Sequence, residues 1–386
     1  MTQPATTSAL SRRDLLLSLA ATPLALHRGA WAQGDLPLLK ICQSTALSGP
    51  LGDLGQALHQ GAKACFAEAN AKGGVHGRKI ELAVLDDGYE AKRALANLDK
   101  FLADRDSFAL FNWFGTPIVA ATLPRVIESG LPFLAPYSGA LLARPKDARN
   151  VFNIRASYPD EAEQLVRHLA TIGIKRIGIA YQNNAFGKEV YDAARAAMEK
   201  YKLGGGAVAT VENSGDDAAA AAAKIIEGNP EAVLVGLAGK PTVDFVKAMR
   251  KLRRGMPLYA LSVMGSAATL RDLGDDGVGI AVSQVVPLPT GVTVPIVRQF
   301  QQAWKVAGTP LDASHLALEG YINARVFLEA LSRAGRNPSR ERFIESLWSI
   351  KRHDLGGFEV NFSQPGSNAS KFVEMTMVAR NGRFIR

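Results

Sequence analysis

From Leu38 onward, short apolar segments alternate with longer segments of helical periodicity, and this alternation constrains the fold more than any other feature. A strand predicted at Leu38–Gln43 precedes a helix at Gln56–Ala71, and the cycle repeats at Lys79–Leu85 and Ala91–Ala103. Such alternation is typical of a parallel sheet covered by helices. We therefore predict an α/β fold.

The same alternation restarts at Val151, after which Arg176–Tyr181 and Ala232–Gly236 are further predicted strands, each followed by a helix. The 386 residues suffice for two domains of ordinary size. Long helices are predicted near the end, at Pro295–Ala307, Ala313–Ala334 and Ser339–Ser349. Two successive α/β units followed by extra helices indicate a chain that passes between two lobes.

The stretch from Phe108 to Ala140 holds the most informative loops. Phe108–Phe111 is a predicted strand, and Thr116 is predicted to cap the helix that follows. Gly130 is expected to end this helix, and Leu131–Ala135 to form the next strand.

Thr116 and Ser138 each place a hydroxyl in a loop beyond the carboxyl end of one of these strands. Open α/β sheets bind ligands at this edge, where helix-start amides favour carboxylates and other acceptors. The two hydroxyls therefore form a plausible half-site. The alternative is that both residues serve only as caps.

Residues 1–32 are interpreted as an export signal. Arg12-Arg13 precedes the apolar run Leu15–Leu26, and Ala30-Trp31-Ala32 is a small–x–small cleavage pattern, so the mature chain is predicted to begin at Gln33. The paired arginines resemble a twin-arginine signal, although the general export route stays open. A membrane anchor is the alternative, but the run is short for a bilayer.

Charge and cysteine content exclude several classes. The formal net charge is +9, yet the basic residues are scattered rather than gathered in a stripe with aromatics, so nucleic-acid binding is not expected. Cys42 and Cys65 lie in no metal-type or CxxC spacing. Two buried thiols are the default interpretation, and a disulfide joining the first strand to the first helix is the alternative.

Sequence patterns of an enzyme are missing. The chain has no G-x-S-x-G elbow, no H-E-x-x-H and no dinucleotide glycine fingerprint. Asp86-Asp87 is a carboxylate pair at a strand end, but adjacent strand residues point to opposite faces, so turn capping is favoured over a shared proton. We expect a protein that is not an enzyme and needs no cofactor or metal.

Several motifs resemble those of a known family: the exported solute-binding receptors of ABC transporters, of the leucine/isoleucine/valine-binding type. The likeness runs in order along nearly the whole mature chain. The motifs that carry it are Ser48-Gly49-Pro50, Glu68–Arg78, Asp86-Asp87, Gly130–Pro136, Phe186-Gly187 and Leu318-Glu319-Gly320-Tyr321.

The resemblance implies a type I periplasmic-binding-protein fold, with two Rossmann-like lobes and parallel sheets joined by three crossing strands. Lobe 1 would comprise residues 33–153 and 286–351, and lobe 2 residues 154–285 and 352–386. A small-molecule ligand would lie in the cleft and be enclosed as the lobes close. The implied protein is a periplasmic monomer that delivers its ligand to an ABC permease, or alternatively a sensor for a membrane signalling partner.

The resemblance also implies site residues. Those placed by motif position around the ligand are Leu54, Tyr89, Thr116, Tyr137, Ser138, Gly139 and Phe186. Amino-acid binders of the family hold the ligand's ammonium with an acidic residue after a second-lobe strand, but here that region reads Ala260–Gly265, with Ser262 and no carboxylate. A buried ammonium without a counter-ion is costly. An amine-free carboxylate, an amide or an aromatic acid therefore fits at least as well as an amino acid.

Overall fold

The computed structural model describes residues 1, 2, 36–264, 266–380 and 382–386. Residues 37–386 form one compact unit. The predicted export signal, with its arginines, cleavage site and Gln33, lies outside the described residues except for the first two.

The first sheet has five strands, all parallel, in the order β2-β1-β3-β4-β5. Its strands are β1 (Leu39–Thr45), β2 (Ile80–Asp86), β3 (Ser107–Phe111), β4 (Phe133–Leu134) and β5 (Val151–Phe152). The predicted α/β class and the predicted strands of this unit are confirmed. β4 is shorter than the predicted Leu131–Ala135, because Ala135 has a positive φ of 56° and leaves the extended conformation.

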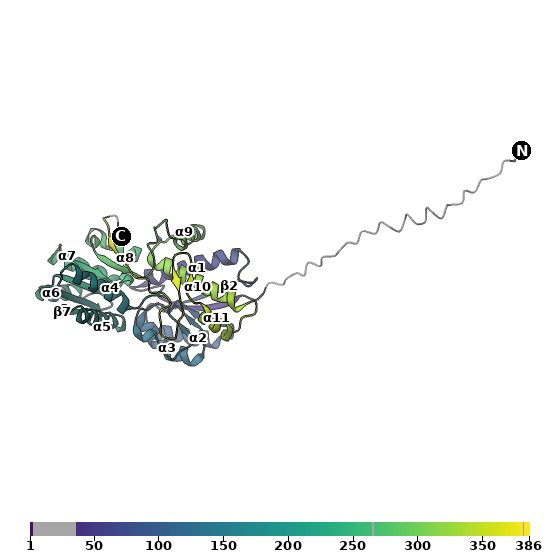
Figure 1. Cartoon of the computed structure of the whole chain (residues 1–386), viewed down its shortest axis with the longest axis horizontal. Coiled ribbons are helices and arrows are strands. Elements are labelled where there is room, and N and C mark those ends of the chain that lie inside the picture. Colours follow the sequence, from purple (N-terminus) through teal and green to yellow (C-terminus); the bar gives the residue numbers. More distant parts are fainter. Residues whose placement is uncertain (3–35, 265, 381) are drawn as a thin grey trace. The chain divides into compact units, whose positions relative to one another are not determined.

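Helices cover both faces of the first sheet (Figure 1). One face packs against α1 (Gly52–Ala71), α9 (Pro295–Ala307), α10 (His315–Ala334) and α11 (Arg340–Ser349), and the other against α2 (Ala91–Ala103), α3 (Thr116–Ser129) and the short η1 (Leu141–Ala143). α1 and α10 cross closely because glycines remove the side chains between them. A Cβ on Gly61 would lie 1.8 Å from the carbonyl oxygen of Ala317.

The second sheet has seven strands in the order β14-β13-β10-β9-β8-β6-β7. Its parallel strands are β6 (Arg176–Gln182), β7 (Gly204–Val211), β8 (Ala232–Gly236), β9 (Leu258–Ala260) and β10 (Ala281–Gln284). Two antiparallel strands extend it, β13 (Glu374–Val378) and β14 (Phe384–Ile385). The five parallel strands repeat the order of the first sheet, so the chain builds the same topology twice.

Helices again cover both faces of the second sheet. The first face packs against α4 (Tyr158–Thr171) and α5 (Ala185–Lys200). The second face packs against α6 (Ala218–Glu227), α7 (Lys240–Leu252) and α8 (Ala267–Leu273), and the turns η2 (Ser262–Met264) and η3 (Gly274–Gly277) flank α8. Ser157 begins α4 with a capping box, its side chain accepting from the backbone N–H of Asp160.

The segment after α11 returns to the first sheet before the chain ends in the second. β11 (His353–Asp354) pairs with β12 (Glu359–Val360), and Leu355 and Phe358 join the core beneath α9 and α10. Ala369 and Ser370 then donate backbone hydrogen bonds to Asn153 and Ile154. The boundary of 352 predicted for the second lobe therefore falls in a segment that packs on the first sheet. β11 and β14 were not predicted.

The predicted N-cap of α3 is wrong. Gly115, with φ 102°, occupies the cap position, and Thr116 is the first helical residue, so the helix has no side-chain capping bond. A positive φ is unfavourable for threonine, so the cap falls to the glycine and the Thr116 hydroxyl is released for other contacts. Gly130 ends the helix in the left-handed conformation, as predicted.

The disulfide alternative is also wrong, because both cysteines are free and buried. Cys42 faces the core under α2 and α3, whereas Cys65 belongs to the core under α9 and α10, on the opposite face of the sheet. The sheet separates the two thiols.

Candidate functional site

Both sheets reverse their strand order at one point, between β1 and β3 in the first and between β6 and β8 in the second. Loops leaving the carboxyl ends of such strands diverge there and create a crevice. The predicted site residues Thr116, Ser138 and Phe186 follow the carboxyl ends of β3, β4 and β6, respectively. The candidate site therefore lies where the carboxyl edges of the two sheets meet.

Loops of the two sheets are in direct contact around this site. The backbone N–H of Leu141 donates to Glu189 of α5 at 2.9 Å. The Ser266 hydroxyl, at the start of α8, donates to Asp53 of α1. Leu51 packs closely on the loop before α7, since a Cβ on Gly239 in that loop would lie 2.4 Å from the Cδ2 of Leu51. The structure thus holds the two halves in a closed arrangement.

Thr116 and Ser138 are brought together as predicted, with their hydroxyl oxygens 2.8 Å apart and both side chains buried. Gly115 N–H donates to the carbonyl of Tyr137, and Tyr137 N–H donates to that of Trp113, so the two loops are also tied by their backbones. Ser138 Oγ further accepts from Ala140 N–H at 3.1 Å. The pair forms a rigid polar corner at the edge of the first sheet.

Aromatic rings surround this corner. Tyr137 stacks on Phe114 with ring centres 5.0 Å apart, and Phe186 meets the edge of Tyr158 at 5.5 Å. Tyr158 packs so tightly on Gly139 that a Cβ there would lie 2.3 Å from its ring. Its hydroxyl lies 3.5 Å from Thr116 Oγ1. Tyr158 joins the two halves, and the sequence patterns did not single it out.

Two further predicted residues line the same region. Leu54 is buried on α1 in the cluster that contains Tyr137 and Phe186. Tyr89 is half-buried with a positive φ of 64°, and its ring lies 5.9 Å from that of Phe114. Its backbone is held by Asp87, which accepts from the N–H of Tyr89 at 2.9 Å. Asp86 and Asp87 each hold their own turn, as predicted, and share no contact.

Ser262 belongs to a buried ionic network with Arg155 and Glu161. Glu161 of α4 accepts from the backbone N–H of Ser262 at 2.8 Å and from its hydroxyl at 3.1 Å. Arg155 donates to the same hydroxyl at 2.5 Å. The hydroxyl of Ser262 is therefore engaged by protein groups.

This network corrects the prediction that the second half lacks an acid near Ser262. The carboxylate of Glu161 comes from a helix about a hundred residues earlier and is fully buried. It also accepts from Ser283 at 2.7 Å and pairs with Arg155 at 3.3 Å. Sequence reasoning missed Glu161 because it searched only the loop after β9.

Arg155 stands at the centre of the network, between elements of both sheets. Its Nη2 faces Glu161, its Nε lies 3.7 Å from Glu319 of α10, and its guanidinium lies 4.5 Å from the ring centre of Tyr137. Burial raises the pKa of Glu319 to about 7, although Arg155 opposes the rise. The signals for these residues were charged side chains inside apolar segments, at Ile154-Arg155 and Leu318-Glu319.

Arg144 holds the loop that follows β4 through hydrogen bonds to its backbone carbonyls. Its Nη1 donates to the carbonyls of Ser138 at 2.9 Å and Ala140 at 2.7 Å, and its Nη2 to that of Arg155 at 3.1 Å. Its Nε donates to the side chain of Asn368. Burial lowers the pKa of Arg144 to about 10, and the nearby charge of Arg155 adds to the effect.

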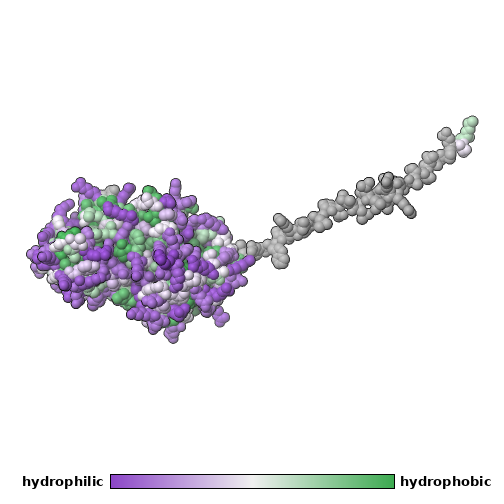
Figure 2. Space-filling model, in the orientation of Figure 1, coloured by the Kyte–Doolittle hydropathy of each residue, from purple (hydrophilic) through white to green (hydrophobic). Residues whose placement is uncertain are grey.

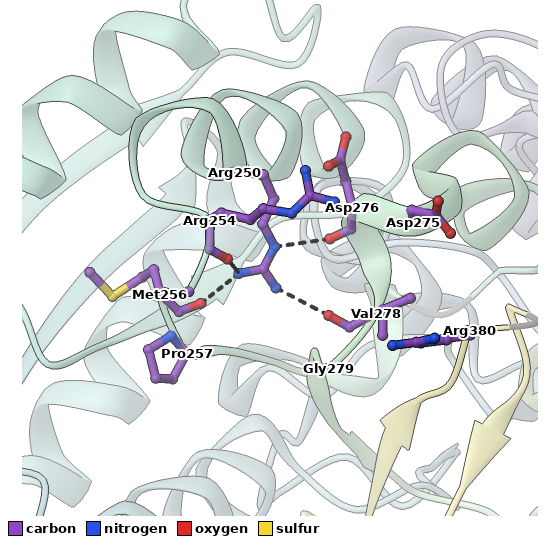
Figure 3. A pocket seen from close by; sticks show the side chains of 10 residues that line it. Arg250, Arg254, Met256, Pro257, Asp275, Asp276, Val278, Gly279 and Arg380 are labelled. Carbon is purple, nitrogen blue, oxygen red and sulfur yellow. Dashed lines mark hydrogen bonds between the residues drawn. The ribbon is translucent and has the colours of Figure 1, made fainter.

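A hollow of about 640 Å³ at the far end of the second sheet is a second candidate (Figure 3). It gathers Arg250, Arg254 and Arg380 beside Asp275 and Asp276. Arg250, however, directs its three nitrogens to the backbone carbonyls of residues 254, 256, 276 and 278. These bonds hold the loops around β9 and β10, so the arginine has a structural role.

Other hollows have a similar volume, including one of about 680 Å³ lined by Arg144, Asp160 and Asn368. The face seen in Figure 2 is mostly hydrophilic with scattered apolar side chains. No described helix is long and apolar enough to cross a membrane. Among the residues that the structure covers, no three His, Cys, Asp or Glu side chains are placed to hold a metal ion.

Comparisons with known proteins agree with this geometry. The family model described as periplasmic binding protein matches residues 39–383. Leu/Ile/Val-binding protein homolog 3 of Brucella melitensis is 24% identical over 92% of this chain and 94% of its own length. Leu/Ile/Val-binding protein BraC3 of Rhizobium johnstonii is 28% identical, but the match spans only 48% of this chain and 47% of the relative.

A solved structure gives the same result. The substrate-binding periplasmic protein from Ralstonia solanacearum superposes with a TM-score of 0.85 at 30% identity, over 90% of this chain and 99% of that protein. The family model covers far more than half of the sequence, and the duplicated sheet order is the architecture that the sequence motifs implied. The chain belongs to the type I periplasmic binding proteins of the leucine/isoleucine/valine-binding family.

Proposed function

We propose that the protein is an extracytoplasmic receptor that binds a small polar organic solute, of the amino acid, amide or carboxylate class, and delivers it to an ABC import permease. The convergence of loops from both sheets on the Thr116–Ser138 corner, beneath a cover of aromatic rings, carries the proposal. Concave sites with apolar walls and a few fixed polar groups are typical of small-molecule recognition.

The two sheets with their helices would act as lobes that open to admit the ligand and close on it. The contacts Asp53–Ser266 and Leu141–Glu189 would break on opening, since each joins elements of different sheets. In this proposal residues 353–369 move with the first lobe, on whose core they pack. The predicted export signal would place the receptor in the periplasm as a monomer.

A thermal-shift screen of the protein from Gln33 onward tests this function. A ligand that binds only the folded state raises the melting temperature. At a ligand concentration a hundred times the Kd, it adds about 2.7 kcal/mol to the free energy of unfolding. We expect a shift with at least one amino acid, amide or carboxylate. Turnover of a bound compound by the purified protein would instead indicate an enzyme.

A further inference from the structure

The guanidinium of Arg155 has donors that the protein does not use. Both Nη1 and Nε are buried, and neither has a hydrogen-bond partner among the described residues. Only 3% of the residue is exposed. A buried charged donor without an acceptor forfeits one of the stronger hydrogen bonds available to a protein. This spare capacity lies next to the candidate site, where the oxygen of a bound ligand can use it.

The neighbouring carboxylates do not accept hydrogen bonds from Nη1 or Nε of Arg155. The oxygens of Glu161 already accept from Ser262, Ser283 and the Nη2 of Arg155. The nearest oxygen of Glu319 lies 3.7 Å from Nε, beyond hydrogen-bond distance. Nη1 therefore remains open to a ligand oxygen.

The charges around the site favour an anion. Arg144 and Arg155 are both buried, and their mutual repulsion contributes to the lowered pKa of Arg144. Glu161 balances one arginine, whereas Arg144 bonds only to carbonyl and amide oxygens within the described structure. Burial favours the neutral form of Glu319. With Glu319 neutral, Glu161 is the carboxylate paired directly with Arg155, and Asp160 and Glu189 attract Arg144 without a direct bond to it.

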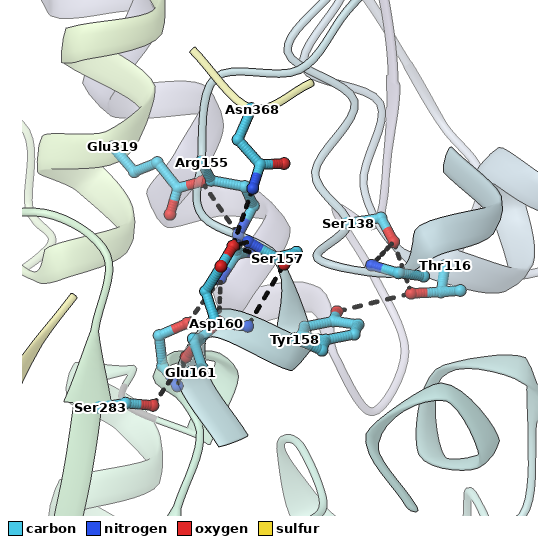
Figure 4. A network of polar contacts seen from close by, with 12 residues as sticks. Thr116, Ser138, Arg155, Ser157, Tyr158, Asp160, Glu161, Ser283, Glu319 and Asn368 are labelled. Carbon is cyan, nitrogen blue, oxygen red and sulfur yellow. Dashed lines mark hydrogen bonds and ion pairs between the residues drawn. The ribbon is translucent and has the colours of Figure 1, made fainter. Parts of the chain in front are cut away.

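The other polar groups at the site are hydroxyls, which can donate as well as accept. Thr116, Ser138, Tyr137 and Tyr158 present hydroxyls, and burial raises the pKa of both tyrosines, so their phenols keep their protons. Tyr158 lies between Arg155 and the Thr116–Ser138 corner (Figure 4). Hydroxyls and a guanidinium suit a group that only accepts hydrogen bonds.

We propose that Nη1 of Arg155 binds a carboxylate oxygen of the ligand, and that the receptor prefers amine-free carboxylates to α-amino acids. This inference rests on the proposed receptor function and specifies its ligand class. An α-ammonium would add a second cation beside Arg155, and the acid nearest Ser262, Glu161, has no free oxygen to receive it.

Two matched probe pairs test the ligand class by isothermal titration calorimetry. 4-Methylpentanoate differs from leucine only by lacking the α-ammonium, and benzoate differs from benzamide in its charge. We expect each acid to bind at least about tenfold more tightly than its partner, because the charged hydrogen bond to Arg155 is lost or opposed in the partner.

Variants then test the residue itself. Arg155→Gln should weaken binding of the better acid by about 10- to 100-fold. Arg250→Gln is the matched control, because it alters an arginine bonded to backbone carbonyls outside the site, and the acid's Kd should stay within about twofold. Circular dichroism establishes that each variant is folded.

Glu319→Gln supplies an independent readout if Arg155→Gln does not fold. Glu319 is faced by Arg155, Glu161 and Tyr137. In the natural protein, affinity for the acid should fall by about tenfold from pH 6 to pH 8 as Glu319 ionises beside the ligand. Glu319→Gln should remove this dependence.

Three outcomes would overturn the inference. Binding of leucine without 4-methylpentanoate would refute the ligand class and leave the receptor function standing. Equal loss of affinity in Arg155→Gln and Arg250→Gln would remove Arg155 from the site. Failure of all four probes to bind at millimolar concentration would count against both the inference and the proposed function.

Discussion

Arg155 and Arg250 are two arginines at opposite ends of the second sheet, and they use their donors differently. Arg250 directs every nitrogen to a backbone carbonyl, and it is half-buried beside an open hollow. Arg155 is buried, pairs with Glu161 at 3.3 Å and with Glu319 at 3.7 Å, and leaves Nη1 and Nε without hydrogen-bond acceptors among the described residues. Figures 3 and 4 show the two environments.

The difference teaches how to separate a structural arginine from a recognition residue. Fold formation alone favours complete pairing, because each unpaired buried donor costs free energy. At Arg155 the spare donors lie beside the candidate site, and we attribute them to an acceptor that arrives with the ligand. Pocket volume does not separate these roles, because the hollow around Arg250, at about 640 Å³, is close in size to one of about 680 Å³ lined by Arg144 and Asn368.

The largest expected effect comes from removing the buried cation. Arg155→Met should lower the free energy of unfolding by about 3–5 kcal/mol, because Glu161 would keep a buried charge without its partner. Urea denaturation followed by circular dichroism measures the change.

The double variant Arg155→Met with Glu161→Gln is the control for this prediction. Since it removes both charges, it should recover at least about 1 kcal/mol of the loss. A loss below about 1 kcal/mol in the single variant would show that the pair contributes little and would erase the contrast with Arg250.

The next largest expected effect is a pH dependence of the free energy of unfolding, caused by Glu319. Its pKa is about 7 in the folded protein, against an ordinary value of 4.5. The folded state then holds a proton that the unfolded state releases, so this group's contribution to stability is full below about pH 4.5 and is lost as pH rises to about 7. The loss amounts to roughly 3 kcal/mol at most.

Comparison with Glu319→Gln isolates this contribution from other titrating groups. The difference in unfolding free energy between the natural protein and the variant should fall across this pH range. A flat difference would mean that Glu319 is ionised in the fold and supplies a second carboxylate charge beside Arg155.

Thr116→Val removes a hydroxyl from the uncharged side of the site. It should weaken ligand binding by about 1–3 kcal/mol if the hydroxyl meets a buried ligand oxygen, and the fold should stay intact. Calorimetry with the best ligand from the screen measures the change. Unchanged affinity would leave Arg155 as the main anchor and reduce the Thr116–Ser138 pair to a structural contact.

The smallest effect is expected at the hollow around Arg250. Arg250→Met should destabilise the fold by about 1–2 kcal/mol, because its carbonyl partners lie beside open solvent and can bond to water. Ligand affinity should not change. A stability loss as large as that of Arg155→Met would show that burial, rather than the use of donors, separates the two arginines.

The sequence by itself determined the α/β class, most strands and helices, and the edge on which the site residues lie. These follow from local periodicity and from chain direction, since parallel strands bring their carboxyl ends to one edge. Thr116 and Ser138 could therefore be paired before their distance was known. The turn roles of Asp86 and Asp87 were equally local, because each accepts from a backbone N–H two residues on, although Asp86 also accepts from Ser48 and Asp87 from Ser44.

Only the tertiary structure decided which groups share the buried site. Arg155, Glu161 and Glu319 come from a crossing segment, a helix of the second sheet and a helix packed on the first. No local pattern encodes such proximity. Gly115, rather than Thr116, is the N-cap of α3 because the backbone at the cap position has a positive φ. The acid that the loop after β9 lacks is supplied from α4, because burial of charge depends on neighbours in space rather than in sequence.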